Sequence, residues 1–138
     1  MDLIKCFNDT MGLATEGKLR HKTRKAQKSV RVYKEGFTAK KHKKFYSKAD
    51  IIVERNTSFA SASKYLKYGR TAVLNFANPV HPGGGVEVGA MAQEECLCRS
   101  SNLFACLSGK AAKEEVYDYH MNNGNNMNSD RLIYIRNV

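Results

Sequence analysis

The spacing of apolar residues predicts a chain of alternating helices and strands. A helix is predicted over residues 2–16, where apolar side chains recur at helical intervals: Leu3, Phe7, Met11 and Ala14. Gly17 stands where a C-terminal cap is expected. Apolar residues are sparse over residues 18–44, where only 29–33 alternates with period two. We therefore predict a short exposed strand at 29–33 and a loop over the remainder of that segment.

Two short β-branched runs in the middle of the chain are typical of buried strands. They cover residues 50–54 and 71–76. A helical pattern between them can be capped by Asn56 or Thr57 and is closed by Gly69. Because strand–helix–strand order is typical of parallel pairing, it predicts an α/β fold with flanking helices.

The remaining elements follow a turn-rich loop. The loop spans residues 77–89, and helices are predicted over 91–107 and 110–121. An Asn- and Gly-rich stretch at 122–128 ends the second helix, and 132–135 is predicted as a strand. An alternating fold requires a further element after this strand. We therefore expect a parallel or mixed sheet that is incomplete at its C-terminal end.

Composition indicates one domain and adds an uneven charge. The 138 residues include 23 Lys and Arg against 13 Asp and Glu, a net charge of +10. Residues 18–44 hold twelve of these basic residues and a single acid, Glu35. This basic segment is either a solvated surface or a site that attracts a polyanion such as RNA or DNA. Aromatic residues that could stack on bases lie within or beside it: Tyr33, Phe37, Phe45 and Tyr46.

The chain carries no signal for secretion or membrane insertion. No apolar stretch approaches the length of a membrane span, and a basic start followed by an apolar run is absent. We expect a soluble cytoplasmic protein with no membrane partner. Its cysteines are expected to be reduced thiols: Cys6, Cys96, Cys98 and Cys106. These cysteines could be combined with His81 or His120 as zinc ligands, but no cysteine pair has the C-x2-C spacing of a structural zinc site. We therefore expect no metal.

The candidate chemistry is concentrated between residues 75 and 95. Asn75-Phe76-Ala77-Asn78 precedes Gly83-Gly84-Gly85, and Gln93-Glu94-Glu95 follows after seven residues. Consecutive glycines permit a close approach, and a helix N-terminus behind them favours an anion such as a diphosphate. Adjacent carboxylates project about 100° apart on a helix, so their environments and pKa values are expected to differ. Taken alone, the glycines could form a structural turn and the acids could simply begin a helix.

In this order the motifs resemble the signature of poly(ADP-ribose) glycohydrolases of the microbial type, which are built on a macrodomain. The Asn-Phe-Ala-Asn stretch is similar to the Asn-Ala-Ala-Asn of macrodomains generally. The resemblance implies a macrodomain-like domain over residues 1–138, in which the ribose–ribose O-glycosidic bonds of poly(ADP-ribose) are hydrolysed. It implies neither a metal nor a cofactor.

The resemblance also implies roles for individual residues. Glu95 would be the general acid and then the base that activates water. Glu94 would hold the adjacent ribose hydroxyls, and Asn78 would contact the ribose. Gly83, Gly84 and Gly85 would line the diphosphate, with Gln93 in the same binding site.

The resemblance leaves open whether the chain is an enzyme. Members of this branch are longer, and the second phosphate loop of a macrodomain has no counterpart between Leu107 and Val138. Two alternatives therefore remain beside the hydrolase: an inactive or non-catalytic ADP-ribose-binding macrodomain, and a basic nucleic-acid-binding protein. The partners expected from these hypotheses are ADP-ribose or its polymer, ADP-ribosylated proteins and, less strongly, nucleic acid.

Overall fold

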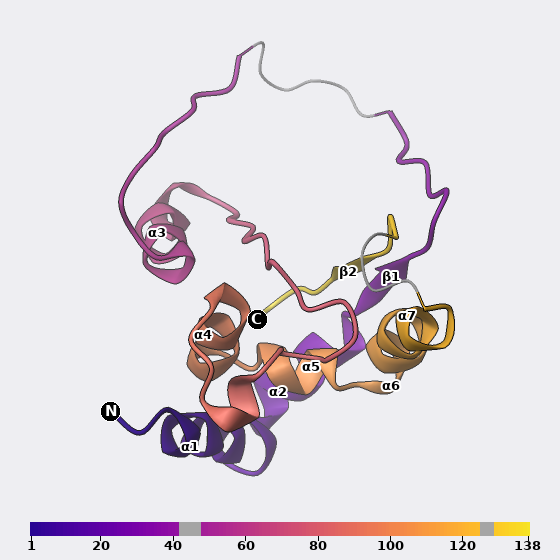
Figure 1. Cartoon of the computed structure of the whole chain (residues 1–138). Coiled ribbons are helices and arrows are strands. Elements are labelled where there is room, and N and C mark those ends of the chain that lie inside the picture. The colour runs from indigo at the N-terminus through magenta and orange to yellow at the C-terminus, as the bar shows by residue number, and fades with distance from the viewer. Residues whose placement is uncertain (42–47, 125–128) are drawn as a thin grey trace. The chain divides into compact units, whose positions relative to one another are not determined.

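The computed structural model of the chain describes residues 1–41, 48–124 and 129–138 (Figure 1). It divides into two compact units, one formed by Met1–Glu35 with Asn75–Val138 and the other by Gly36–Leu74. Three parts of the sequence-based predictions lie outside the described residues. They are the last residues of the basic segment, its aromatic pair and the end of the Asn-rich stretch: 42–44, Phe45 with Tyr46, and 125–128.

The first unit begins with helix α1 (Leu3–Thr15), which confirms the helix predicted there. The side chain of Asp2 caps it by accepting a hydrogen bond of 2.9 Å from the backbone N–H of Lys5. Phe7 is buried and meets the ring of Phe104 edge-on, with ring centroids 4.9 Å apart. The helix thus packs its predicted apolar side against the C-terminal half of the unit.

Helix α2 (Arg20–Lys28) replaces the loop that was expected at this position. The prediction was wrong because it relied on apolar periodicity, and the residues that this helix buries are the small Thr23 and Ala26. Arg, Lys and Gln, which make up most of the helix, have high intrinsic helix propensity.

A two-stranded sheet joins distant parts of the unit. Strand β1 (Arg31–Tyr33) pairs with β2 (Leu132–Tyr134), and Val32 lies opposite Ile133 (Figure 1). Both segments were predicted as strands. Their pairing is antiparallel, whereas the sequence favoured parallel pairing between other segments. The α/β class is confirmed, with helices around a small sheet.

The helix predicted over residues 91–107 is divided into α4 (Gln93–Ser100) and α5 (Leu103–Leu107). Ser101 separates the two with an extended backbone at φ −153° and ψ 179°. Its hydroxyl donates to the carbonyl of Leu97 at 2.8 Å and accepts from the N–H of Leu103 at 3.2 Å. The side chain of Ser101 thereby forms hydrogen bonds with the backbone at the end of α4 and at the start of α5.

The next predicted helix is largely confirmed, but its middle is widened. It consists of α6 (Lys110–Ala112), a π-helical turn over Lys113–Tyr117, and α7 (Asp118–Asn122). The buried apolar core of the unit draws on α1, the 3-10 turn Val86–Val88, α4, α5, α6 and the π-helical turn: Phe7, Val86, Leu97, Cys98, Leu103, Leu107, Ala112 and Tyr117. None of the helices in the described part of the chain has the length and apolar character needed to cross a membrane.

The second unit contains helix α3 (Ser58–Tyr65) and a 3-10 turn at Leu66–Tyr68. Thr57 caps α3 by accepting a hydrogen bond from the N–H of Ala60 at 3.2 Å, as its sequence position suggested. Lys64 forms an ion pair of 2.6 Å with Glu54. Helix α3 buries none of its residues.

The two runs predicted as buried strands, 50–54 and 71–76, have no regular structure, and this prediction was wrong. Ile51, Ile52 and Val53 are 89%, 64% and 95% exposed. Strand propensity describes how a side chain fits a pleated, half-buried surface, and it is realised only beside a neighbouring strand. Among the described residues no strand lies next to either run.

Candidate active site

The glycine motif lies in a loop that is shaped by a side-chain turn. The Oδ1 of Asn78 accepts hydrogen bonds from the backbone N–H groups of Val80 at 2.9 Å and His81 at 2.8 Å. The N–H of Gly84 then donates to the carbonyl of His81 at 3.0 Å. The turn and the glycines therefore form one continuous hydrogen-bonded loop.

Gly83 and Gly84 adopt backbone conformations that favour glycine, with φ of +71° and +58°. A Cβ atom at Gly83 would lie 2.6 Å from Cδ2 of Phe104, and one at Gly84 would meet the carboxylate of Glu95. These two positions therefore combine an unusual backbone angle with a close approach. The glycines bring the loop directly against the acids at the start of α4.

Glu94 is buried and holds the first part of this loop. Its Oε2 accepts from the backbone N–H of Asn78 at 2.7 Å, and its Oε1 accepts from Nδ2 of Asn75 at 3.1 Å. Burial raises the pKa of Glu94, the hydrogen bonds from Asn78 and Asn75 oppose that rise, and the neighbouring charge of Glu95 adds to it. Both carboxylate oxygens of Glu94 are thus engaged in positioning the loop.

Glu95 is also buried, but its two oxygens have different surroundings. Oε1 accepts from the backbone N–H of Gly85 at 3.0 Å. Oε2 is buried and has no hydrogen-bond partner among the described residues. A buried acceptor without a partner is costly, so this oxygen is a favourable position for a donor group supplied by a ligand. Such a carboxyl group can transfer a proton to or from a molecule bound beside Gly84.

All seven site residues expected from the sequence are brought together, although several use their polar groups within the protein. Gln93 accepts from the backbone N–H of Phe76 at 2.8 Å through its Oε1. The side-chain oxygen of Asn78 is occupied by its turn, and the N–H of Gly85 is bonded to Glu95. These groups position the loop.

Three residues that support the site were not predicted as site residues. His120 on α7 forms a hydrogen bond of 2.7 Å between its Nδ1 and the carbonyl of Pro79. Arg99 donates from Nη1 to the carbonyl of Ala90 at 2.6 Å and so ties the end of the loop to α4. Asn75 could have been found because it begins the Asn-Phe-Ala-Asn stretch. No local sequence signal links His120 to a carbonyl 41 residues earlier.

Two neutral side chains lie near the two acids. Burial raises the pKa of the Cys98 thiol to about 12, and the charges of Glu94 and Glu95 contribute to the rise. Burial and the charge of Glu94 likewise raise the pKa of Tyr117. At neutral pH neither side chain carries a charge. In the described part of the chain, no group of three or more His, Cys, Asp or Glu side chains could hold a metal ion.

Comparisons with known proteins point to one family. The family described as "Microbial-type PARG, catalytic domain" matches residues 3–138. A crystal structure of poly(ADP-ribose) glycohydrolase (PARG) from Thermomonospora curvata is similar, with 27% identity and a TM-score of 0.77 over 96% of this chain and 54% of that one. A structure of that enzyme bound to the inhibitor ADP-HPD has 28% identity and a TM-score of 0.76, over 96% and 52% of the two chains. The chain therefore spans about half the length of these structures. No curated protein matches the chain.

Proposed function

Because the chain belongs to the family of microbial-type PARG catalytic domains, we propose that its site acts on poly(ADP-ribose) and hydrolyses the ribose–ribose O-glycosidic bond. The observation that carries the proposal is the buried, unpartnered Oε2 of Glu95 beside the glycine motif. The inhibitor ADP-HPD in the similar enzyme supports ADP-ribose and its polymer as the ligands.

Glu95 carries the proton in this proposal. Protonated at Oε2, it donates to the ribose oxygen that leaves as the glycosidic bond breaks, and its carboxylate then takes a proton from the attacking water. The bond from the N–H of Gly85 holds Oε1 in place while Oε2 reacts. Protonation and deprotonation at one oxygen return the residue to its starting state after each turnover.

Glu94 orients the substrate and the loop together. Its oxygens already accept from Asn78 and Asn75, and each carboxylate oxygen has a second lone pair that can accept from a ribose hydroxyl. The charge of Glu95 also adds to the rise in the pKa of Glu94.

The remaining residues of the motif form the binding surface. Gly83, Gly84 and Gly85 let the diphosphate approach the backbone closely, because they carry no side chain of their own. The ribose is contacted by Asn78 through its amide nitrogen, since the Oδ1 atom is taken by the turn. Gln93 keeps the preceding segment in position through Phe76. The four free cysteines agree with a reducing compartment, and we include a cytoplasmic location in the proposal.

Two measurements on the 138-residue chain test this function. Calorimetric titration with ADP-ribose, with AMP for comparison, shows whether the site binds its ligand. Release of ADP-ribose from the polymer is then measured for the unaltered chain, Glu95→Gln and Glu87→Gln. Glu87 is the matched control, because it is an exposed acid in the adjacent 3-10 turn.

We expect selective binding of ADP-ribose, and cleavage that falls by roughly 10²-fold or more in Glu95→Gln but is retained in Glu87→Gln. Binding without cleavage would instead establish a non-catalytic ADP-ribose-binding domain. If a demonstrably folded sample binds no ADP-ribose, or if Glu95→Gln cleaves the polymer at the full rate, the proposed function of this chain is wrong.

A further inference from the structure

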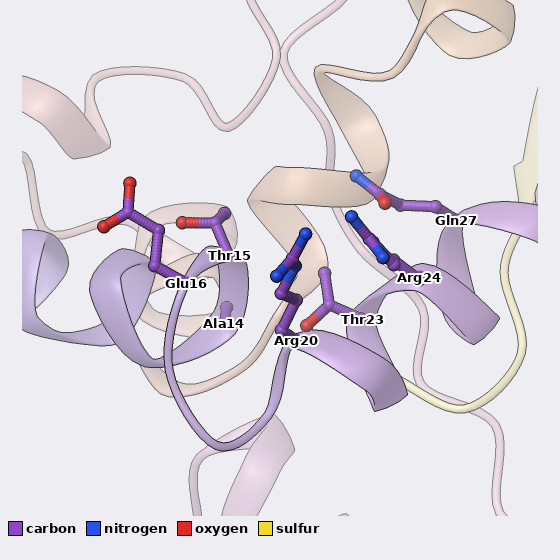
Figure 2. Close-up of a pocket in the computed structure, with 7 residues that line it drawn as sticks. All are labelled: Ala14, Thr15, Glu16, Arg20, Thr23, Arg24 and Gln27. Carbon is purple, nitrogen blue, oxygen red and sulfur yellow. The ribbon is translucent and has the colours of Figure 1, made fainter.

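A cavity of about 380 Å³ lies between the end of α1 and helix α2. None of its lining residues belongs to the glycine motif. Its polar lining comes from the two helices: Thr15, Glu16, Arg20, Thr23, Arg24 and Gln27 (Figure 2). Its volume falls within the range of small-ligand pockets, about 300 to 1,000 Å³.

The cavity presents two guanidinium groups that have no partner among the described residues. Arg20 and Arg24 are one helical turn apart, and Figure 2 shows both side chains extending to the same side of α2. Within the described residues, no hydrogen bond or ion pair engages either guanidinium. The one lining acid, Glu16, points away from the two arginines in this view.

A buried hydroxyl adds a neutral donor to this lining. Thr23 is only 2% exposed, and its Oγ1 accepts from Nδ2 of Asn102 at 3.5 Å while retaining a proton to donate. Gln27 is fixed beside it by a bond of 2.9 Å from Nε2 to the carbonyl of Ala105. Two guanidinium groups on one side of α2 match a compact oxyanion, because guanidinium groups bind phosphate oxygens in a bidentate manner.

The cavity is less suited to a strand of nucleic acid. Binding of single strands combines positive charge with aromatic side chains on which bases stack. None of the described residues that line this cavity is aromatic. The features present are those that recognise a phosphate group rather than a base.

We propose that the α1–α2 cavity binds a diphosphate group of an ADP-ribose chain and that Arg20, Arg24 and Thr23 hold this group. This inference rests on the proposed function. It is a second site for the substrate, formed by residues that play no part in bond cleavage. An ADP-ribose chain repeats the diphosphate in every unit, so one unit can occupy the cavity while another occupies the glycine motif of the same or another protein molecule.

The test compares two double variants of α2 that remove the same charge. Arg20→Ala with Arg24→Ala removes both guanidinium groups from the cavity. Lys22→Ala with Lys25→Ala removes two exposed cations of the same helix that do not line the cavity. Circular dichroism checks that both variants are folded. Binding is measured for ADP-ribose, for a purified short ADP-ribose chain and for single-stranded DNA. Backbone amide shifts of isotopically labelled protein are followed during titration with inorganic pyrophosphate.

We expect the arginine variant to bind the ADP-ribose chain roughly tenfold more weakly or worse, and the lysine variant to lose about threefold at most. Binding of ADP-ribose at the glycine motif is expected to stay unchanged in both variants. Pyrophosphate is expected to shift the amides of Thr15 and Thr23 saturably in the unaltered chain and in the lysine variant only.

Equal losses in the two variants would overturn the proposal, because they would indicate diffuse charge attraction. Equal losses for the ADP-ribose chain and single-stranded DNA would overturn it in favour of a general nucleic-acid surface. Absence of ADP-ribose binding with intact pyrophosphate shifts would refute the proposed function and leave a phosphate site unrelated to it.

Discussion

The carboxylate of Glu95 accepts the backbone N–H of Gly85 at 3.0 Å, while the adjacent Glu94 accepts the N–H of Asn78 at 2.7 Å. Two consecutive acids therefore fasten two ends of the same loop. The two acids therefore differ, because Glu94 uses both oxygens on the loop whereas Oε2 of Glu95 has no partner in the part of the chain that the structure describes.

Replacing Gly84 tests the close approach of the loop to these acids. Gly84→Ala is expected to lower the free energy of unfolding by more than the roughly 1–2 kcal/mol of a left-handed backbone, because its Cβ also meets Glu95. Gly124→Ala is the control, with a similar φ of +60° and open space around the Cβ. Urea denaturation of both variants measures the difference, and equal losses would show that the carboxylate moves aside without cost.

The raised pKa of Glu94 predicts the sign of a pH effect. The folded state binds this proton more tightly than the unfolded state, where the pKa is near its ordinary 4.5. The stability that the group contributes is therefore fully present below pH 4.5 and is lost as pH rises toward the folded pKa, with a slope of at most about 1.4 kcal/mol per pH unit.

Comparison with Glu94→Gln isolates this effect from the other acids. We expect the unfolding free energy of the unaltered chain, minus that of Glu94→Gln, to decrease from acidic toward neutral pH in urea denaturation series. A difference that increases with pH would mean that the hydrogen bonds from Asn78 and Asn75 outweigh burial.

His120 is expected to position the site from α7. Removing its ring in His120→Ala leaves the carbonyl of Pro79 without this hydrogen bond, which costs roughly 1–3 kcal/mol of stability. We expect ADP-ribose binding to weaken together with the stability, because Pro79 follows Asn78 in the loop. His21→Ala, at an exposed position of α2, is the control in both thermal denaturation and calorimetry. Identical behaviour of the two variants would argue against a positioning role.

The cysteines are expected to differ in reactivity. Burial raises the pKa of Cys98 to about 12 and that of Cys106 to about 11, so neither forms much thiolate at pH 8. Cys96 is exposed on α4. Mass spectrometry after brief treatment with iodoacetamide should find Cys96 modified first, and Cys98 and Cys106 only after denaturation. Early modification of Cys98 would mean that the glycine loop opens readily.

Sequence patterns predicted which residues come together around the glycine loop better than they predicted the strands. Gly83, Gly84, Glu94 and Glu95 were predicted as site residues because three consecutive glycines are followed, after seven residues, by Gln-Glu-Glu. Their environments were not predictable, since the unpartnered Oε2 of Glu95 depends on how the loop folds back onto α4.

Longer-range features were missed for related reasons. Helix α2 has almost no apolar stripe, so its high intrinsic helix propensity was overlooked. The run at 50–54 has strong strand propensity, but in the described chain it meets no neighbouring strand. The contact between His120 and Pro79 depends on tertiary packing, which no local pattern encodes.

The exposed run Ile51-Ile52-Val53 affects how separate molecules behave toward one another. An extended β-branched segment is a template for sheets that form between chains, and such sheets begin aggregation. The net charge of +10 keeps molecules apart, but salt screens this repulsion within a Debye length of about 8 Å at physiological ionic strength. Raising the salt concentration therefore weakens capture of an anionic substrate and at the same time lowers the colloidal stability of the protein.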